Sequence, residues 1–174
     1  MKNKIFLIIL ILFVTLISKG NAHAEKLQIE SSEVNIQKKK SEIKFSGNVQ
    51  AKDQYNDKLQ ANEAIYSKDN DLLKSIGATK IITSENYILD GRDVIFDNKR
   101  NTIKSMSPAT IIDADGNQIY VEMFDYNSIK NVLFSKGKIE LSDKNNNKFK
   151  FSEIYIDEKK RKIVGSDAKL FFNS

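Results

Sequence analysis

From residue 25 onward, apolar positions recur with a period of 30 residues, and five rows of 30 align without a gap. Within each row the apolar residues lie two apart and are rich in β-branched and aromatic types, which predicts strands with one buried face. Five columns are apolar or aromatic in every row: Ile29, Leu59, Leu89, Ile119 and Phe149; Val34, Ala64, Val94, Phe124 and Ile154; Ile36, Tyr66, Phe96, Tyr126 and Ile156; Ile43, Leu73, Ile103, Leu133 and Ile163; and Ala51, Ile81, Ile111, Leu141 and Phe171.

Two polar clusters separate the apolar runs of each row. The first covers 38–41 and its equivalents 68–71, 98–101, 128–131 and 158–161, and the second covers 53–57 and its equivalents. Both are rich in Asn, Asp, Ser and Gly, which accept turn backbone angles. Each row is therefore predicted to be strand, turn, strand, turn, with strands of about ten residues.

The parity of the apolar positions changes between residues 31 and 34 of the first row and at the equivalent place in the others. One extra residue in a strand is a β-bulge, which bends the strand. We expect the acidic side chains at this bend, Glu33, Glu63, Asp93 and Glu153, to point to solvent. The fold class predicted is all-β: a bent two-sheet jellyroll of about ten antiparallel strands in five repeats, open at both ends.

The first 24 residues have the order of a secretory signal peptide, with Lys2 and Lys4 ahead of an apolar run and Ala22-His23-Ala24 at the end. We predict cleavage after Ala24 and a single domain over 25–174. The net charge of +5 falls to +2 without the signal, so no nucleic-acid partner is expected. An uncleaved inner-membrane anchor is the alternative.

The remaining chain contains no histidine and no cysteine. A Ser-His-Asp or Cys-His mechanism and a zinc site built on those ligands are excluded, and we expect no enzyme activity, no metal and no cofactor. A hydrolase using carboxylates alone is the enzyme alternative. The stretch Asp113-Ala114-Asp115-Gly116-Asn117 has alternating carboxylates, but its glycine is misplaced for a calcium loop, and we predict a turn.

Three phrases, FSGNVQAK (45–52), LQANEAIYSKDNDLLKSIGATKI (59–81) and FSEIYIDEKKRKIVGSDAKLFF (151–172), resemble the OstA-like β-jellyroll family of lipopolysaccharide transport. This family includes LptA and the N-terminal periplasmic domain of LptD, and the last phrase is most similar to the LptD type. The resemblance covers nearly all of residues 25–174. The large membrane barrel and the usual cysteines of LptD are absent from the chain, so a truncated LptD-like protein and a free-standing bridge unit both remain open.

The resemblance implies a periplasmic module that holds lipid A acyl chains in an apolar groove. Its implied partners are lipopolysaccharide and other jellyroll domains, joined by edge-strand addition, with an outer-membrane barrel as a further partner. The groove would be lined by Ile36, Tyr66, Leu89, Val94, Phe96, Ile103, Ile111, Ile119, Phe124, Tyr126, Leu133, Phe149 and Ile156. The alternatives are a membrane-anchored LptC-like component and a structural or adhesive β-solenoid with a dry core.

The two turn columns differ in charge. The first sums to +7 and the second to −5, which predicts one basic and one acidic long edge. We expect the basic edge to contact lipid phosphates through Lys39, Lys99, Arg100 and Lys160, because Lys and Arg are the usual phosphate partners. Ordinary solvated turns are the alternative.

Overall fold

The computed structural model describes residues 27–37 and 41–173, which form one antiparallel sheet of fifteen strands. The predicted signal peptide and its cleavage site lie outside these residues. No helix in the part described is long and apolar enough to cross a membrane. The strands are β1 (Leu27–Glu30), β2 (Glu33–Gln37), β3 (Glu42–Asp53), β4 (Lys58–Ser67), β5 (Leu72–Ile82), β6 (Ile88–Arg92), β7 (Ile95–Asp97), β8 (Thr102–Ser105), β9 (Ala109–Ile112), β10 (Gln118–Val121), β11 (Phe124–Asn127), β12 (Val132–Ser142), β13 (Lys148–Asp157), β14 (Lys162–Ser166) and β15 (Lys169–Phe171).

The structure has fifteen strands where about ten were predicted, because five of the predicted strands are broken in two at the bend. The pairs β1/β2, β6/β7, β8/β9, β10/β11 and β14/β15 each take the place of one predicted strand. Pro108 lies in the β8–β9 break, where its missing N–H cannot interrupt a ladder. The continuous strands show register shifts at the bend, between Ser46 and Val49 and between Lys136 and Ile139. The extra residue lies on the second strand of the row, where Gly47 and Asn48 oppose Asn62 alone, and not on the first strand as predicted.

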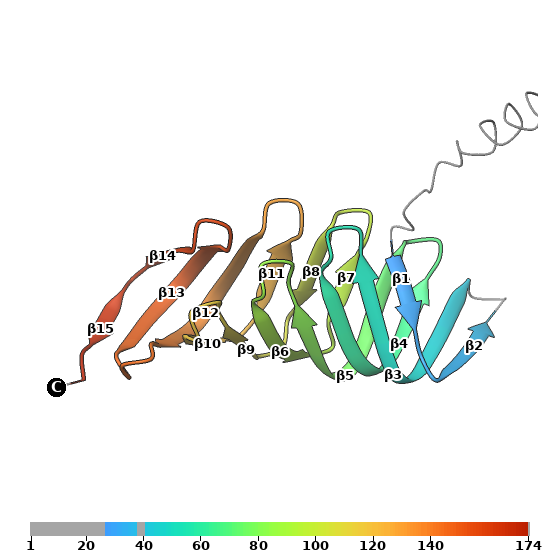
Figure 1. Ribbon diagram of the computed structural model, residues 1–174, viewed down its shortest axis with the longest axis horizontal. Coiled ribbons are helices and arrows are strands. Elements are labelled where there is room, and N and C mark those ends of the chain that lie inside the picture. The colour runs from blue at the N-terminus through green and yellow to red at the C-terminus, as the bar shows by residue number, and fades with distance from the viewer. Residues whose placement is uncertain (1–26, 38–40, 174) are drawn as a thin grey trace, which may run out of the picture.

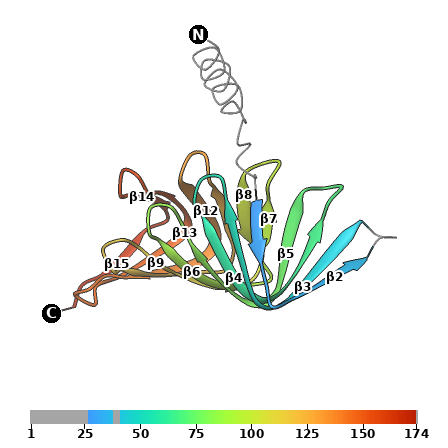
Figure 2. The same cartoon turned by 45° about the vertical axis from the view of Figure 1, so that its right-hand side comes forward.

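The sheet is folded along the line of these bends. Figure 1 shows the strands side by side along the long axis, with β1 and β2 at one end and β14 and β15 at the other. Figure 2 shows the same strands as a V, with the bends at its vertex. At the ends, β1 and β2 are hydrogen-bonded to β3, and β14 and β15 to β13. Of the predicted carboxylates at the bend, Glu33 and Asp93 are exposed, and Glu63 and Glu153 are half-buried.

The two kinds of turn are each repeated with the same geometry. In the turns at 53–57, 83–87, 113–117 and 143–147, which we call the second turns, the backbone N–H of the first residue donates to the carbonyl of the fifth. Their fourth residue is left-handed: Asn56, Asn86, Gly116 and Asn146. The first turns end in a left-handed residue at 41, 71, 101, 131 and 161. In the first four of these turns, the carbonyl of that residue accepts a hydrogen bond from the next first turn, as Asn101 does from Ser128 N.

Strand register aligns two continuous rows of apolar side chains on the inner face of the sheet, because directly paired residues point to the same side. The first ladder consists of Ile36, Ile43, Tyr66, Leu73, Phe96, Ile103, Tyr126, Leu133, Ile156 and Ile163. The second ladder consists of Ile29, Ala51, Leu59, Ile81, Leu89, Ile111, Ile119, Leu141, Phe149 and Leu170. Leu170 occupies the position predicted for Phe171, because the register of β15 differs by one residue from that of the equivalent strands in the other rows.

One matched pair of substitutions tests this arrangement, because Ile103 and Ile36 belong to the same ladder and differ in burial. Ile103 is 0% exposed and Ile36 is 58% exposed. Ile103→Ala should lower the free energy of unfolding by about 2–5 kcal/mol, and Ile36→Ala should change it by no more than about 0.5 kcal/mol. Urea denaturation of both variants measures the difference. Equal losses for the two would contradict the fold described here.

Candidate functional site: an apolar interior closed by a seam of turns

The structure places the thirteen predicted groove residues on the inner face, but it does not leave most of them accessible. Ten have exposed fractions of 0–1%: Leu89, Val94, Phe96, Ile103, Ile111, Ile119, Phe124, Tyr126, Leu133 and Ile156. The other three are Ile36, which is exposed, and Tyr66 and Phe149, which are partly buried. The middle of the interior is therefore a packed core, and the inner face is accessible only toward the two ends of the sheet.

The interior is closed because the first turns and the second turns meet, along a line that we call the seam. Asn101 Oδ1 accepts a hydrogen bond from Gln54 Nε2 at 3.3 Å, and Asn131 Nδ2 donates to Ser84 Oγ at 3.0 Å. Arg161 Nη1 pairs with Asp115 Oδ1 at 3.2 Å. The sequence predicted two edges of opposite charge, but not that these edges lie against each other.

The turns that meet at the seam are separated by a constant distance in sequence. The three contacts join residues 47, 47 and 46 positions apart, which is close to one and a half repeats. Among the residues described, the cross-seam hydrogen bonds and ion pairs thus begin at 101 on the first turns and end at 115 on the second turns. The first turns ending at 41 and 71 and the second turn at 143–147 extend beyond these contacts, at opposite ends.

Exposure of the ladders follows from this offset. The first ladder loses its cover at the N-terminal end, where Ile36 is exposed and Ile43 and Tyr66 are half-buried. The second ladder loses its cover at the C-terminal end, where Phe149 is half-buried and Leu170 is 51% exposed. Each end of the sheet therefore presents apolar surface next to an end strand that is hydrogen-bonded to a neighbouring strand on one side only.

A polar network runs beneath the seam from one row of turns to the other. Asn131 Nδ2, which donates to Ser84, also lies 3.1 Å from the Tyr126 hydroxyl, and that hydroxyl donates to Glu158 Oε2 at 3.2 Å. Asp57 Oδ1 accepts from the backbone N–H of Ser84 at 2.8 Å. Residues from four different turns and from β11 are thus joined in one chain of contacts.

Four carboxyl groups are buried in the turns of this seam: Asp53, Asp57, Asp113 and Glu158. Burial, followed by the nearby Asp57 carboxyl, raises the pKa of Asp53 to about 6. Burial raises the pKa of Asp57 as well, and it raises the pKa of Glu158 to about 8 against hydrogen bonds that lower it. Asp57 Oδ2 and Glu158 Oε1 have no hydrogen-bond partner among the described residues, and neither does the adjacent Ser128 hydroxyl.

The predicted phosphate-binding residues lie on the first turns, where each described member is engaged within or beside its own turn. Lys99 Nζ donates to the carbonyl of Asp69 at 2.8 Å, Arg100 pairs with Asp97 at 3.1 Å, and Lys160 pairs with Asp157 at 2.8 Å. All three side chains are exposed, so these contacts contribute little stability. Lys39 lies outside the described residues.

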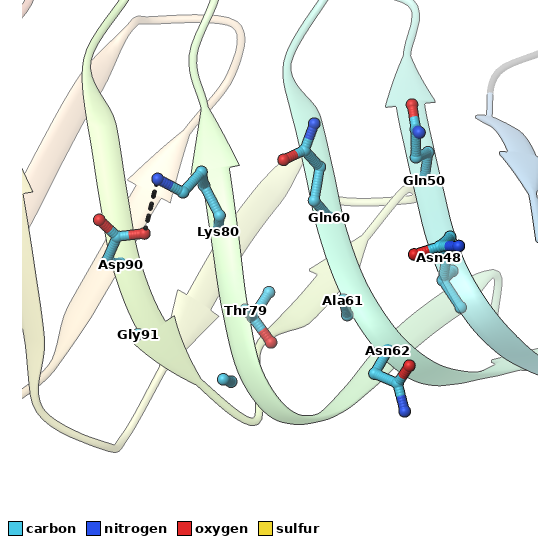
Figure 3. Close-up of a pocket in the computed structure, with 11 residues that line it drawn as sticks. Asn48, Gln50, Gln60, Ala61, Asn62, Thr79, Lys80, Asp90 and Gly91 are labelled. Atoms are coloured by element: carbon cyan, nitrogen blue, oxygen red, sulfur yellow. Dashed lines mark ion pairs between the residues drawn. The ribbon is translucent and has the colours of Figure 1, made fainter.

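A surface hollow lies on the outer face of the sheet, away from the two ladders. It has a volume of about 520 Å³ and is lined on β3 and β4 by Asn48, Gln50, Gln60 and Asn62. Figure 3 shows these amides beside the Lys80–Asp90 ion pair, which spans 3.3 Å. The lining also includes Val49, Ala61 and Ala78, and it contains no aromatic ring on which a sugar could stack.

The loop 113–117 is one of the second turns, as predicted. Asp113 Oδ1 accepts hydrogen bonds from the backbone N–H groups of Asp115 and Asn117, so this oxygen is already used in stabilising the turn. Within residues 27–37 and 41–173, no group of three or more Asp or Glu side chains is arranged to hold a metal ion.

The sequence did not identify Asp53, Asp57 and Glu158 as a group. They occupy polar turn columns, and Glu158 is far from Asp53 and Asp57 in the chain, so their residue types alone indicated solvated turns. The opposite charges of the two turn columns were the available signal that these turns could meet. The burial of the acids depends on the one-and-a-half-repeat offset, which the 30-residue period does not specify.

Comparisons with known proteins add a distant structural neighbour. No family model matches the chain, and no curated protein matches it. Among solved structures it is similar to LptH from Pseudomonas aeruginosa, described as the LptA-homologous periplasmic component of the lipopolysaccharide transport device. The identity is 12%, the TM-score is 0.36, and the match covers 85% of this chain and 95% of that one. At this TM-score the likeness carries no functional weight.

Proposed function

We propose that this protein is a periplasmic lipopolysaccharide-binding module of the OstA-like type, which holds acyl chains against its apolar inner face and joins other jellyroll domains through its edge strands. It acts without catalysis. The observation that carries the proposal is the pair of ten-residue apolar ladders, sealed in the middle and uncovered at opposite ends. The resemblance of the three sequence phrases supports lipopolysaccharide as the lipid.

The physical need for such a module is the cost of exposing acyl chains to water. Each methylene group removed from water is stabilised by about 0.8 kcal/mol, so a lipid with several chains cannot cross an aqueous space unaided. The uncovered ends offer surface of the required kind, because Ile36 and Tyr66 lie at one end and Phe149 and Leu170 at the other. Acyl chains would first contact the protein there.

The end strands favour partners that continue the sheet. Throughout the chain, the second half of one row pairs with the first half of the next, as Ile43 pairs with Tyr66. A jellyroll domain placed after β14 and β15 in the same manner would set its own equivalent of Ile36 opposite Ile163. It would also bring a first turn to the second turn at 143–147, and both open ends would be covered.

A structural β-solenoid with a dry core remains the second candidate. The observation in its favour is that ten of the thirteen predicted groove residues are 0–1% exposed. It shares the edge pairing with the first proposal and differs in binding no lipid. An anchored LptC-like role depends on residues 1–24 and is the variant of the first proposal in which the signal is retained.

Lipid binding is tested by photocrosslinking in cells. A photoreactive residue at Ile36, Tyr66 or Phe149 should form a lipopolysaccharide adduct, since these ladder positions are accessible at the ends. Asn35, which is exposed beside Ile36 on β2 and has the opposite strand parity, is the matched control and should give none. Absence of adducts at all three ladder positions would favour the dry solenoid.

The phosphate contact is tested by charge reversal. Lys99→Glu with Arg100→Glu should weaken lipopolysaccharide binding at low salt by about fivefold, since two exposed charge contacts contribute on the order of 1 kcal/mol together. Lys74→Glu with Lys136→Glu makes the same charge change on exposed strand positions and should leave binding nearly unchanged. Equal effects of the two double variants, measured by titration, would show that only net charge matters.

Edge pairing is tested with cysteines, which the chain otherwise lacks. Directly opposed residues of antiparallel strands have Cβ atoms about 4.5–5.5 Å apart, close enough for oxidation to a disulfide. A mixture of Ile36→Cys and Ile163→Cys proteins should therefore form mixed dimers faster than either protein forms dimers alone. Non-reducing electrophoresis with differently sized tags gives the ratio. Preferential dimers of a single variant would contradict head-to-tail pairing.

A further inference from the structure

The seam is the one closure of this interior that depends on side chains. The bends opposite it are covalent chain, and the walls are held by backbone ladders. Across the seam the contacts are Gln54 to Asn101, Ser84 to Asn131 and Asp115 to Arg161. The first and third of these are exposed to solvent, so they hold the rims together weakly. What lies beneath them therefore decides whether the seam stays closed.

Beneath the seam, closure brings together groups that water would solvate better. Asp57 and Glu158 are 0% and 2% exposed, and each has one carboxyl oxygen without a partner. They belong to different rims, since Asp57 lies in a second turn and Glu158 in a first turn. An uncharged carboxyl tolerates this setting, whereas a carboxylate there is both desolvated and close to a like charge.

The charged surroundings of Glu158 do not compensate a negative charge. Asp57 and Glu85 face it from the second turns, and both oppose its ionisation. Tyr87 faces it from the turn of Glu85 and has its pKa raised to about 12 by burial first and then by Asp113 and Glu158. On the first turns, Arg161 is paired with Asp115, Lys160 is paired with Asp157, and Lys130 and Lys159 extend into solvent. Thr83 and Tyr126 favour the ionised form of Glu158, but burial outweighs them and raises its pKa.

We propose that the seam is a proton-controlled latch: it closes over the apolar interior while Asp53, Asp57 and Glu158 are uncharged and separates when they ionise, uncovering the ladders along their length. The role of opening in admitting lipid rests on the proposed function, whereas the latch itself does not. The latch explains how an interior that is dry when closed could be opened to an acyl chain.

The direction of the pH dependence follows from the raised pKa values. A carboxyl whose pKa is higher in the closed state stabilises closure fully below its ordinary pKa and loses that effect as the pH rises through the closed-state pKa. For Asp53 the window runs from about 4 to about 6, and for Glu158 from about 4.5 to about 8. Each released proton raises the ratio of open to closed protein by up to about tenfold per pH unit within its window.

The distance across the seam is the quantity to measure. Nitroxide labels on Gln54→Cys and Asn101→Cys, in a chain that has no other cysteine, give a distance distribution by pulsed electron paramagnetic resonance. The longer-distance population should rise at least tenfold between pH 5 and pH 9. A distribution that does not change over this range overturns the latch.

Glu158→Gln identifies the group responsible, because an amide keeps an acceptor for Tyr126 but cannot ionise. Its seam should stay closed at pH 7 to 8, where the unmodified protein opens. Glu153→Gln, the same change on the bend of β13 and away from the seam, should open like the parent. If Glu158→Gln does not fold, Asp53→Asn serves instead and should remove the part of the transition below about pH 6. Unaltered transitions in both seam variants overturn the proposal.

Binding of N-phenyl-1-naphthylamine, a fluorescent apolar probe, separates the latch from the proposed function. Probe fluorescence should rise with pH in the reduced, unlabelled Gln54→Cys/Asn101→Cys protein and fall back when a short bis-maleimide joins the two cysteines. A seam that opens without taking up the probe supports the latch and counts against the lipid role. Probe uptake that rises with pH equally in the crosslinked protein overturns the latch, because the interior is then reached by another route.

Discussion

The structure depends on a single constraint: one antiparallel sheet must bury its own apolar face. No helix and no second sheet from elsewhere in the described chain covers the two ladders. The sheet solves this by folding along its bends. Residues that would lie about 15 to 30 Å apart on a flat sheet, at a rise of about 3.3 Å per residue, thereby face each other across the interior. The bulges, the left-handed turn residues and the seam all follow from this folding.

The folding cannot be symmetrical, because neighbouring strands in a sheet are twisted relative to one another. The two rows of turns along the edges of a twisted, folded sheet therefore meet with an offset in sequence, and here that offset is close to one and a half repeats. The same number fixes which ladder residues are sealed and which are exposed. The buried ladder residues in the middle of the molecule and the exposed ones at its ends are therefore consequences of one geometric relation.

The repeat explains how much of this the sequence could predict. Inward positions such as Phe96 and Ile103 were predictable because strand parity places them, and the turns were predictable because Asn, Asp and Gly mark them in fixed columns. The breaks at β6/β7 and β10/β11 were not, since an inserted residue predicts a bend but does not say whether pairing continues through it. The buried state of Glu158 was not predictable either, because its partners lie in other rows and only the phase of the rims brings them near.

The burial of acids in a fold with few other buried charges needs a physical explanation, since apolar groups of similar size at the same positions would stabilise the closed form more. A well-packed apolar seam would make the closed state permanent. Polar groups with unsatisfied oxygens keep the free energy of closure small and dependent on protonation, while the backbone ladders of the walls are unaffected. Under the proposed function, an acyl chain that enters at Ile36 or Phe149 would gain contact only with the exposed end of a ladder. Longer contact requires that the rims separate, and the apolar surface then uncovered is itself what the chain would cover, at about 25 cal/mol per Å². Lipid and seam thus compete for the same surface, so conditions that weaken the seam should strengthen lipid binding.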